Sequence, residues 1–70
     1  MTRDEWIAEF ARGIGVDPPS RQEIGALLEL AAEAAHASER TAAPLACWLG
    51  GRSGQSLERL MEVAEGVGER

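Results

Sequence analysis

The chain has 70 residues, which leaves room for one small domain that spans residues 1–70. Its formal net charge at pH 7 is −5, and because nucleic-acid phosphates and anionic lipid heads repel an acidic protein, this charge argues against nucleic acid and membrane partners. Cys47 is the only cysteine and His36 the only histidine, which excludes an internal disulfide and leaves no Cys/His pair with zinc-ligand spacing.

A first helix is predicted to begin after Thr2. Thr2 and Glu5 have the spacing of a capping box, in which two side chains satisfy free backbone N–H groups of the first turn. We expect this helix to end at Gly13, because glycine adopts the left-handed conformation at a helix end without a Cβ penalty. Asp17-Pro18-Pro19 cannot continue a helix. The apolar side of the helix would hold Trp6, Ile7, Phe10 and Ala11.

A long central helix is predicted from the cap at Ser20 to about Arg40, with Glu23 completing a second capping box. At roughly 100° per residue, one side of it is apolar or small, which is typical of a buried helical face. That side holds Ile24, Leu27, Leu28, Ala31, Ala34, Ala35, Ser38 and Ala42, and the opposite side holds Glu29, Glu33, His36 and Arg40. The small residues favour close approach of another helix.

Two shorter helices are predicted to follow. Pro44 fits the first turn of the third, which we expect to end at Gly50-Gly51, and Ser56 can cap the fourth. The third would carry Leu45, Cys47, Trp48 and Leu49, and the fourth Leu57, Leu60, Met61, Ala64 and Val67. The predicted fold class is therefore all-α: a small four-helix bundle with a short first helix, a long central second helix, a short third helix and a fourth.

The expected core is small for a domain that must stand alone. Burying roughly 6,500 Å² on folding would do little more than offset the conformational entropy of ordering about 70 residues. We therefore expect a partner subunit or well-formed helices to contribute stability. Trp6 and Trp48 are expected in the core, so that Trp48→Ala would cost about 3–5 kcal/mol. The acidic start of the chain, which lacks the apolar run of a signal peptide, favours a cytoplasmic location.

The polar residues around the junction of the second and third helices are the candidate site. The predicted interaction or anion-binding rim consists of His36, Ser38, Arg40, Trp48 and Arg52. Arginine and tryptophan are common anchors of interfaces, and arginine also meets carboxylates and phosphates. A second interpretation is structural: Glu39 or Arg40 clamps the turn before Pro44, His36 belongs to a surface charge ladder with Glu33 and Arg40, and Trp48 lies in the core.

No catalytic, metal-binding or cofactor-binding set is predicted. Cys47 has apolar neighbours and no base to deprotonate it, so it is expected to be buried filler. The string from Gly50 to Gly54 has the composition of an anion nest but lacks the lysine of a phosphate loop. The alternative hypothesis is a small ligand-binding or catalytic module in which His36, Arg40, Cys47 and Arg52 line a concave pocket.

Three strings carry a resemblance to a known family: Asp4-Glu5-Trp6-Ile7, Ala35 to Arg40, and Ala43-Pro44-Leu45 followed by Cys47-Trp48-Leu49. The chain resembles small uncharacterised bacterial helical domains found alone or as a C-terminal extension of molybdenum-cofactor guanylyltransferase-like (MobA-like) proteins. The nucleotidyltransferase motifs are absent, so the resemblance implies an accessory part and not the transferase.

The leading hypothesis is therefore a non-catalytic protein-interaction module. It would self-associate as a homodimer or dock onto a molybdenum-cofactor-related enzyme through the second helix and the Trp48 region. A small-residue helix face and a core too small for comfortable stability motivate this prediction.

Overall fold

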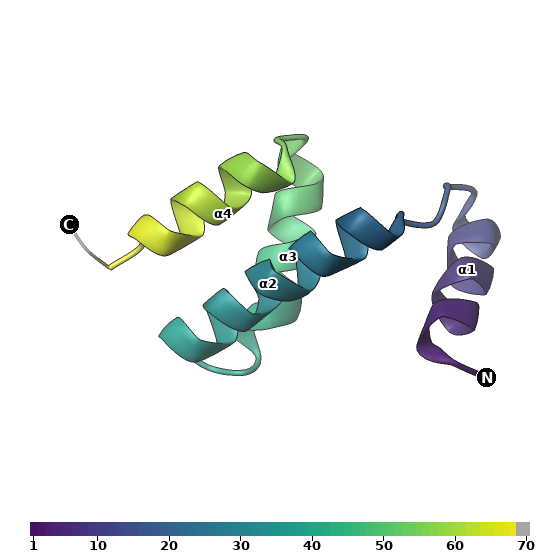
Figure 1. Cartoon of the computed structure of the whole chain (residues 1–70), viewed down its shortest axis with the longest axis horizontal. Helices are drawn as coiled ribbons and strands as arrows, with labels where there is room; N and C mark the ends of the chain where they lie inside the picture. The colour runs from purple at the N-terminus through teal and green to yellow at the C-terminus, as the bar shows by residue number, and fades with distance from the viewer. Residues whose placement is uncertain (69–70) are drawn as a thin grey trace.

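The computed structural model describes residues 1–68, and all regular secondary structure within them is helical (Figure 1). The four helices are α1 (Arg3–Ile14), α2 (Arg21–Ala37), α3 (Ala42–Ser53) and α4 (Leu57–Gly66). The predicted all-α fold class, with four helices and the second as the central one, is confirmed. None of these helices is both long enough and apolar enough to cross a membrane.

The start of α1 is as predicted, but its end is not at Gly13. The Thr2 side chain accepts from the Glu5 backbone N–H, and the Glu5 side chain accepts from the Thr2 N–H. The helix continues to Ile14 and ends where Gly15 adopts φ 80°, with the N–H groups of Gly15 and Val16 bonded to the carbonyls of Arg12 and Ala11. This is a Schellman motif, in which the left-handed residue must lie at Gly15. A Schellman motif is commonly accompanied by an apolar contact between the two residues that here are Val16 and Ala11. Ala11 is buried.

The capping box at Ser20 and Glu23 starts α2 as predicted. The helix ends at Ala37 instead of about Arg40, because Ser38 leaves the helical region with φ −139° and ψ −101°. Pro44 lies in the first turn of α3, again as predicted. The predicted end of α3 at Gly50-Gly51 was wrong. The helix continues to Ser53 and is ended by Gly54, which has φ 70°.

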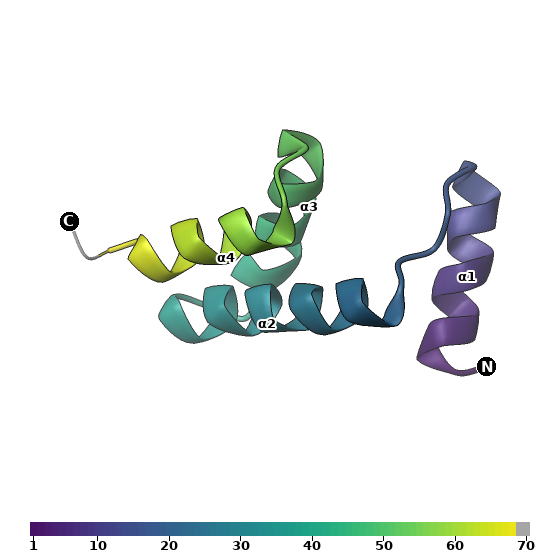
Figure 2. The same cartoon turned by 45° about the horizontal axis from the view of Figure 1, so that its top comes forward.

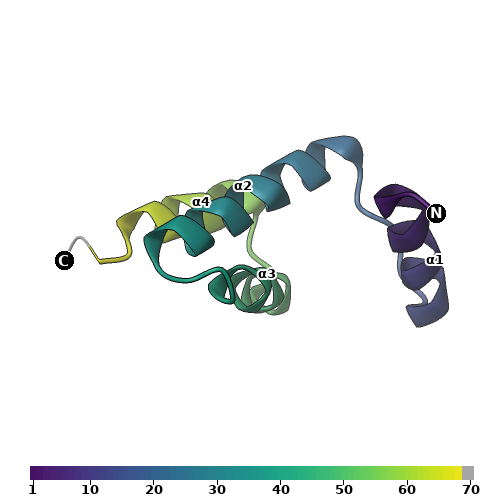
Figure 3. The same ribbon diagram turned by 90° about the horizontal axis from the view of Figure 1, so that it is seen from below.

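Packing is centred on α2, which contacts both α3 and α4. Helices α2 and α4 run side by side in the same general direction, and α3 crosses on one side of both (Figures 1 and 3). Gly50 lets α3 approach α4 closely, since a Cβ atom there would lie 2.7 Å from Cδ1 of Leu60. Helix α1 stands away from this three-helix unit, beyond the start of α2 (Figure 2).

The core is smaller than the sequence predicted. Among the described residues, the only buried hydrophobic side chains are Ala11 and Leu30. Leu30 was absent from the predicted buried face of α2, whereas Leu28, which was included, is 52% exposed. Trp6 and Trp48 are also exposed, at 54% and 63%, so the prediction that they lie in the core was wrong. Their helix faces are apolar, but no other helix of the chain covers them.

The molecule consequently exposes more surface than a compact chain of its mass. Its accessible surface is 5766 Å², whereas a compact monomer of 7.5 kDa would expose about 4,200 Å². The radius of gyration is 12.9 Å and the principal extents are 40 × 23 × 19 Å, compared with a radius of about 11 Å expected for a compact domain of this length. About 1,500 Å² of extra surface therefore faces outward.

Candidate functional site

The main concavity is an apolar groove between the C-terminal half of α2, α3 and α4, with a volume of about 640 Å³. Small residues from all three helices line it, among them Ala34, Ala46 and Ala64. They are accompanied by larger apolar residues, which stay exposed because no further helix covers them: Leu45, Leu49, Val63 and Val67. We call this surface, which also includes Leu30, Ala37, Ala42, Gly50 and Leu60, the α2–α3–α4 groove.

The polar groups in the α2–α3–α4 groove serve the fold. The Ser53 hydroxyl donates to the Gly50 carbonyl at 2.7 Å and accepts from the Gln55 N–H at 3.2 Å. It therefore closes the C-terminal end of α3 and has no adjacent base that would make it a nucleophile. Glu33 and Ser38 also line the groove, and no hydrogen bond from another side chain orients either of them among the described residues. The lining of the groove is therefore mainly apolar.

A second exposed apolar surface lies on α1. The rings of Trp6 and Phe10 stack, with centroids 5.2 Å apart and an interplanar angle of 17°. Ile14 follows one turn later on the same face, and its side chain is 59% exposed. We call these three residues the α1 ridge. The pair of stacked rings is fixed on a regular helix and faces no other helix of the chain.

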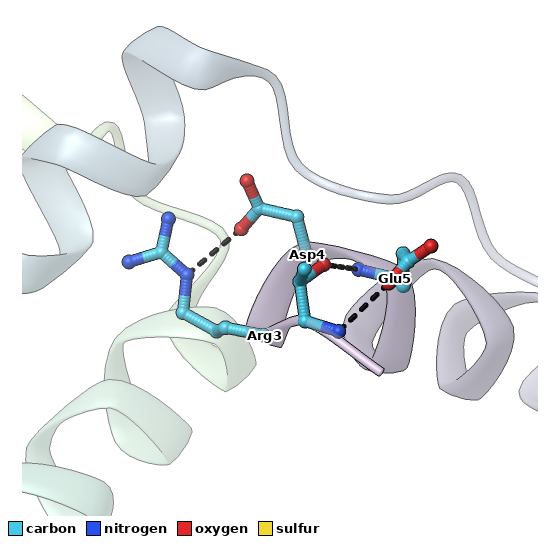
Figure 4. A network of polar contacts seen from close by, with 4 residues as sticks. Arg3, Asp4 and Glu5 are labelled. Atoms are coloured by element: carbon cyan, nitrogen blue, oxygen red, sulfur yellow. Dashed lines mark hydrogen bonds and ion pairs between the residues drawn. The ribbon is translucent and has the colours of Figure 1, made fainter.

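The first turn of α1 is held by polar contacts that lie at the surface (Figure 4). Nε of Arg3 donates to Asp4 at 2.8 Å, and this hydrogen bond lowers the pKa of the Asp4 carboxyl below its ordinary value. The backbone N–H of Thr2 donates to the Glu5 carboxylate at 2.7 Å, which lowers the pKa of Glu5. These ionised groups stabilise the start of the helix, where the helix dipole is positive.

The predicted rim is divided between the two ends of α3. The Arg52 guanidinium lies 5.2 Å from the centroid of the Trp48 ring, which is a cation–π contact one turn apart on α3. His36 and Arg40 are exposed near the other end, at the close of α2 and in the loop that follows. Since a helix rises about 1.5 Å per residue, α3 separates Arg40 from Arg52 by about 15 Å along its axis. Of the five predicted rim residues, Trp48 and Arg52 are therefore in contact with each other, and Ser38 lines the groove.

The residues of the alternative ligand-binding hypothesis do not share the groove. The residues that line it include none of His36, Arg40, Cys47 and Arg52. Cys47 is half-buried. Among the described residues the ion pairs are Arg3–Asp4 and Arg59–Glu62, so the predicted clamp by Glu39 or Arg40 is not formed there. No three His, Cys, Asp or Glu side chains within residues 1–68 gather as metal ligands would.

The sequence predicted an apolar side of α1 that holds Trp6 and Phe10, but not that it is exposed. The α2–α3–α4 groove was not predicted. The α2–α3–α4 groove had a signal in the spacing of Leu45 and Leu49 on α3, which share a face. The α1 ridge had one in the four-residue spacing of Trp6, Phe10 and Ile14. In both cases periodicity indicated a common face, but only the packing of the helices decides whether that face is covered.

The fold and these surfaces define a small all-helical domain with an apolar groove and a separate amphipathic helix whose apolar face is exposed. The chain matches the family described as a domain of unknown function (DUF6457) over residues 1–69, and it belongs to that family. This match shows no link to MobA-like proteins. Comparison with curated proteins found no match, and neither did comparison with solved structures.

Proposed function

We propose that this domain is a non-catalytic protein-interaction module whose α2–α3–α4 groove and Trp48 region bind protein. The observation that carries the proposal is the imbalance between buried and exposed apolar side chains. Two hydrophobic residues among residues 1–68 are buried, whereas the large side chains of Leu45, Trp48 and Leu49 are each more than half exposed. Contiguous apolar surface of this kind is characteristic of sites that another protein covers.

The composition of the exposed surface supports binding to protein. The pair of Trp48 and Arg52 combines the two residue types most enriched among the energetically dominant residues of interfaces. Trp48 presents a large rigid ring, and Arg52 adds a charge that a carboxylate of the partner can meet. The apolar groove supplies the area that would lose water on binding.

The same geometry argues against the alternative of a catalytic or ligand-binding module. Such a module needs a concave site in which polar or ionisable groups converge. The proposed groups His36, Arg40, Cys47 and Arg52 lie outside the groove. The groove itself offers Glu33 and Ser38, which no side-chain hydrogen bond joins within residues 1–68, and Ser53, whose hydroxyl is engaged by backbone groups.

The biological setting that we propose is a molybdenum-cofactor-related enzyme as a partner, or a second copy of the chain. The first rests on the resemblance of the chain to domains that extend MobA-like proteins. A direct test mixes the purified domain with a MobA-like guanylyltransferase and measures binding by calorimetry, with Trp48→Ala as the weakened variant. Binding that Trp48→Ala leaves unchanged would contradict a role for the Trp48 region.

Photo-crosslinking in the native cell tests the interaction module without assuming the partner. A photoreactive phenylalanine analogue replaces Leu49, which lines the groove, and in a control chain it replaces Gln22, which is exposed at the start of α2. We expect protein adducts at Leu49 and few at Gln22. If neither self-adducts nor adducts to another protein form at Leu49 in a folded chain, the domain is not an interaction module.

A further inference from the structure

The α1 ridge and the α2–α3–α4 groove are both exposed and apolar, and the ridge has large side chains where the groove has many small ones. The ridge has two stacked aromatic rings and one branched aliphatic side chain, from Trp6, Phe10 and Ile14, along about 12 Å of helix. The groove offers small side chains from three helices below exposed leucine and valine side chains. Large side chains that insert between small ones give the close packing seen in protein interiors.

We propose that the α2–α3–α4 groove of one copy holds the α1 ridge of a second copy, and that the exchange is reciprocal in a homodimer. This inference rests on the proposed function, because it names the partner of the same groove. A twofold axis makes the two contacts identical, so each copy donates one ridge and receives another. Each groove would be covered by α1 of the other copy, because α1 of its own chain stands away from it.

The surface areas agree with a dimer of this type. Each chain exposes 5766 Å², which exceeds the value for a compact monomer of this mass by about 1,500 Å². Two copies that covered this excess would bury about 3,000 Å² in total, which lies within the range of about 2,000–5,000 Å² for obligate homodimers. The missing burial is thus of the size that one second copy supplies.

The connection between α1 and α2 favours a second copy over the chain's own α1. The segment from Gly15 to Ser20 contains Pro18-Pro19, whose fixed φ angles make it stiff and extended. It holds α1 beyond the start of α2 (Figure 2). The groove begins at Leu30, about 13 Å further along α2 than Arg21. An extended connection directs the ridge away from its own groove and makes it available to another copy.

Light scattering coupled to gel filtration, from micromolar to millimolar chain, tests the homodimer. Phe10→Glu places a charge on the ridge and Leu45→Glu places one in the groove. Because these residues are 52% and 64% exposed, we expect the fold to tolerate both replacements. Leu28→Glu is the matched control, since Leu28 is 52% exposed but belongs to neither surface. We expect Phe10→Glu and Leu45→Glu each to raise the dissociation constant about 30-fold or more, and Leu28→Glu to leave it within about threefold of that of the unaltered chain.

Mixing the two defective variants identifies which surfaces meet. A mixture of Phe10→Glu and Leu45→Glu chains contains one intact ridge and one intact groove, on different copies, so a heterodimer should form although neither variant dimerises alone. A dimer that persists in Phe10→Glu, or a mixture that stays monomeric, would overturn the reciprocal exchange.

Fluorescence of Trp6 reports on the ridge itself. In a Trp48→Phe chain Trp6 is the only tryptophan, and we expect its emission to shift to shorter wavelength as the chain concentration rises. Emission that is already blue-shifted in a dilute monomer would show that α1 occupies its own groove. A chain that is monomeric at every concentration overturns this inference, while adducts to another protein at Leu49 would still uphold the interaction module.

Discussion

Replacing Trp48 by alanine distinguishes a core residue from a surface residue. The side chain is 63% exposed, so about a third of the 3–5 kcal/mol typical of a buried aromatic ring is at risk. The contact with Arg52 adds about 0.5–1 kcal/mol, as expected for an exposed cation–π pair. We therefore expect Trp48→Ala to lower the free energy of unfolding by about 1.5–2.7 kcal/mol.

The matched comparison is Leu30→Ala. Leu30 of α2 is 4% exposed, so its truncation should cost about 2–5 kcal/mol although leucine is the smaller side chain. Urea unfolding followed by circular dichroism gives both values, measured at chain concentrations low enough that no dimer is populated. The order of the two effects is the prediction: the smaller buried residue matters more than the larger exposed one.

One result would refute this reasoning. If Trp48→Ala costs 3 kcal/mol or more at every chain concentration, Trp48 is a core residue of the monomer and α3 packs with a different face inward. If its cost instead grows as the chain concentration rises, the ring is covered by a partner copy, because binding adds to the measured stability.

Three further predictions concern glycine, charge and salt. Gly51→Ala should raise the free energy of unfolding by about 0.4–1 kcal/mol, because a Cβ atom at Gly51 meets nothing within 4 Å. Gly50→Ala should be about 1–3 kcal/mol less stable than Gly51→Ala, because a Cβ atom at Gly50 would lie 2.7 Å from Leu60. Equal urea midpoints for the two variants would contradict the contact between α3 and α4. The folded-state pKa of Glu5 is lowered, so the stabilisation of α1 by the Glu5 carboxylate is complete above the ordinary pKa of 4.5 and is lost as the pH falls through the lower folded-state value. Helicity followed from pH 6 to pH 2 should lose this part of its pH dependence in Glu5→Gln. Identical curves for the two chains would disprove this role of Glu5. Raising sodium chloride from about 0.05 to 1 M, which shortens the Debye length, should strengthen self-association as measured by sedimentation, and weakening would indicate an interface held by ion pairs.

The starts of the helices could be predicted because N-terminal caps are local. Thr2, Ser20 and Ser56 each accept a hydrogen bond from a backbone N–H three residues later, so a few consecutive residues contain the whole signal. The ends were less predictable. Gly13 and Gly15 are both possible stops, and so are Gly50-Gly51 and Gly54, but of these glycines only Gly15 and Gly54, which have positive φ, end a helix. Which glycine adopts that conformation depends on the contacts beyond it.

The core and the candidate site could be predicted only in part, because periodicity shows which residues share a face and not what covers it. Leu28 and Leu30 are both leucines of α2, yet one is 52% exposed and the other 4%. The difference arises from the positions of α3 and α4, which no local pattern encodes. Likewise, the sequence predicted a candidate site at the junction of α2 and α3 from its polar residues. The groove that forms there is instead lined mainly by alanine, leucine and valine.

The acidic charge of the chain fits an apolar interface better than it fits an electrostatic one. A domain that exposes a groove and a ridge of apolar side chains would associate without selectivity if it were neutral. With a net charge of −5, any two copies repel each other, and only a contact that buries much apolar area can overcome this repulsion. Charge thus excludes small, poorly fitting contacts and leaves the complementary one. In the proposed dimer, the leucine, valine and alanine side chains of the groove would provide most of the free energy of binding.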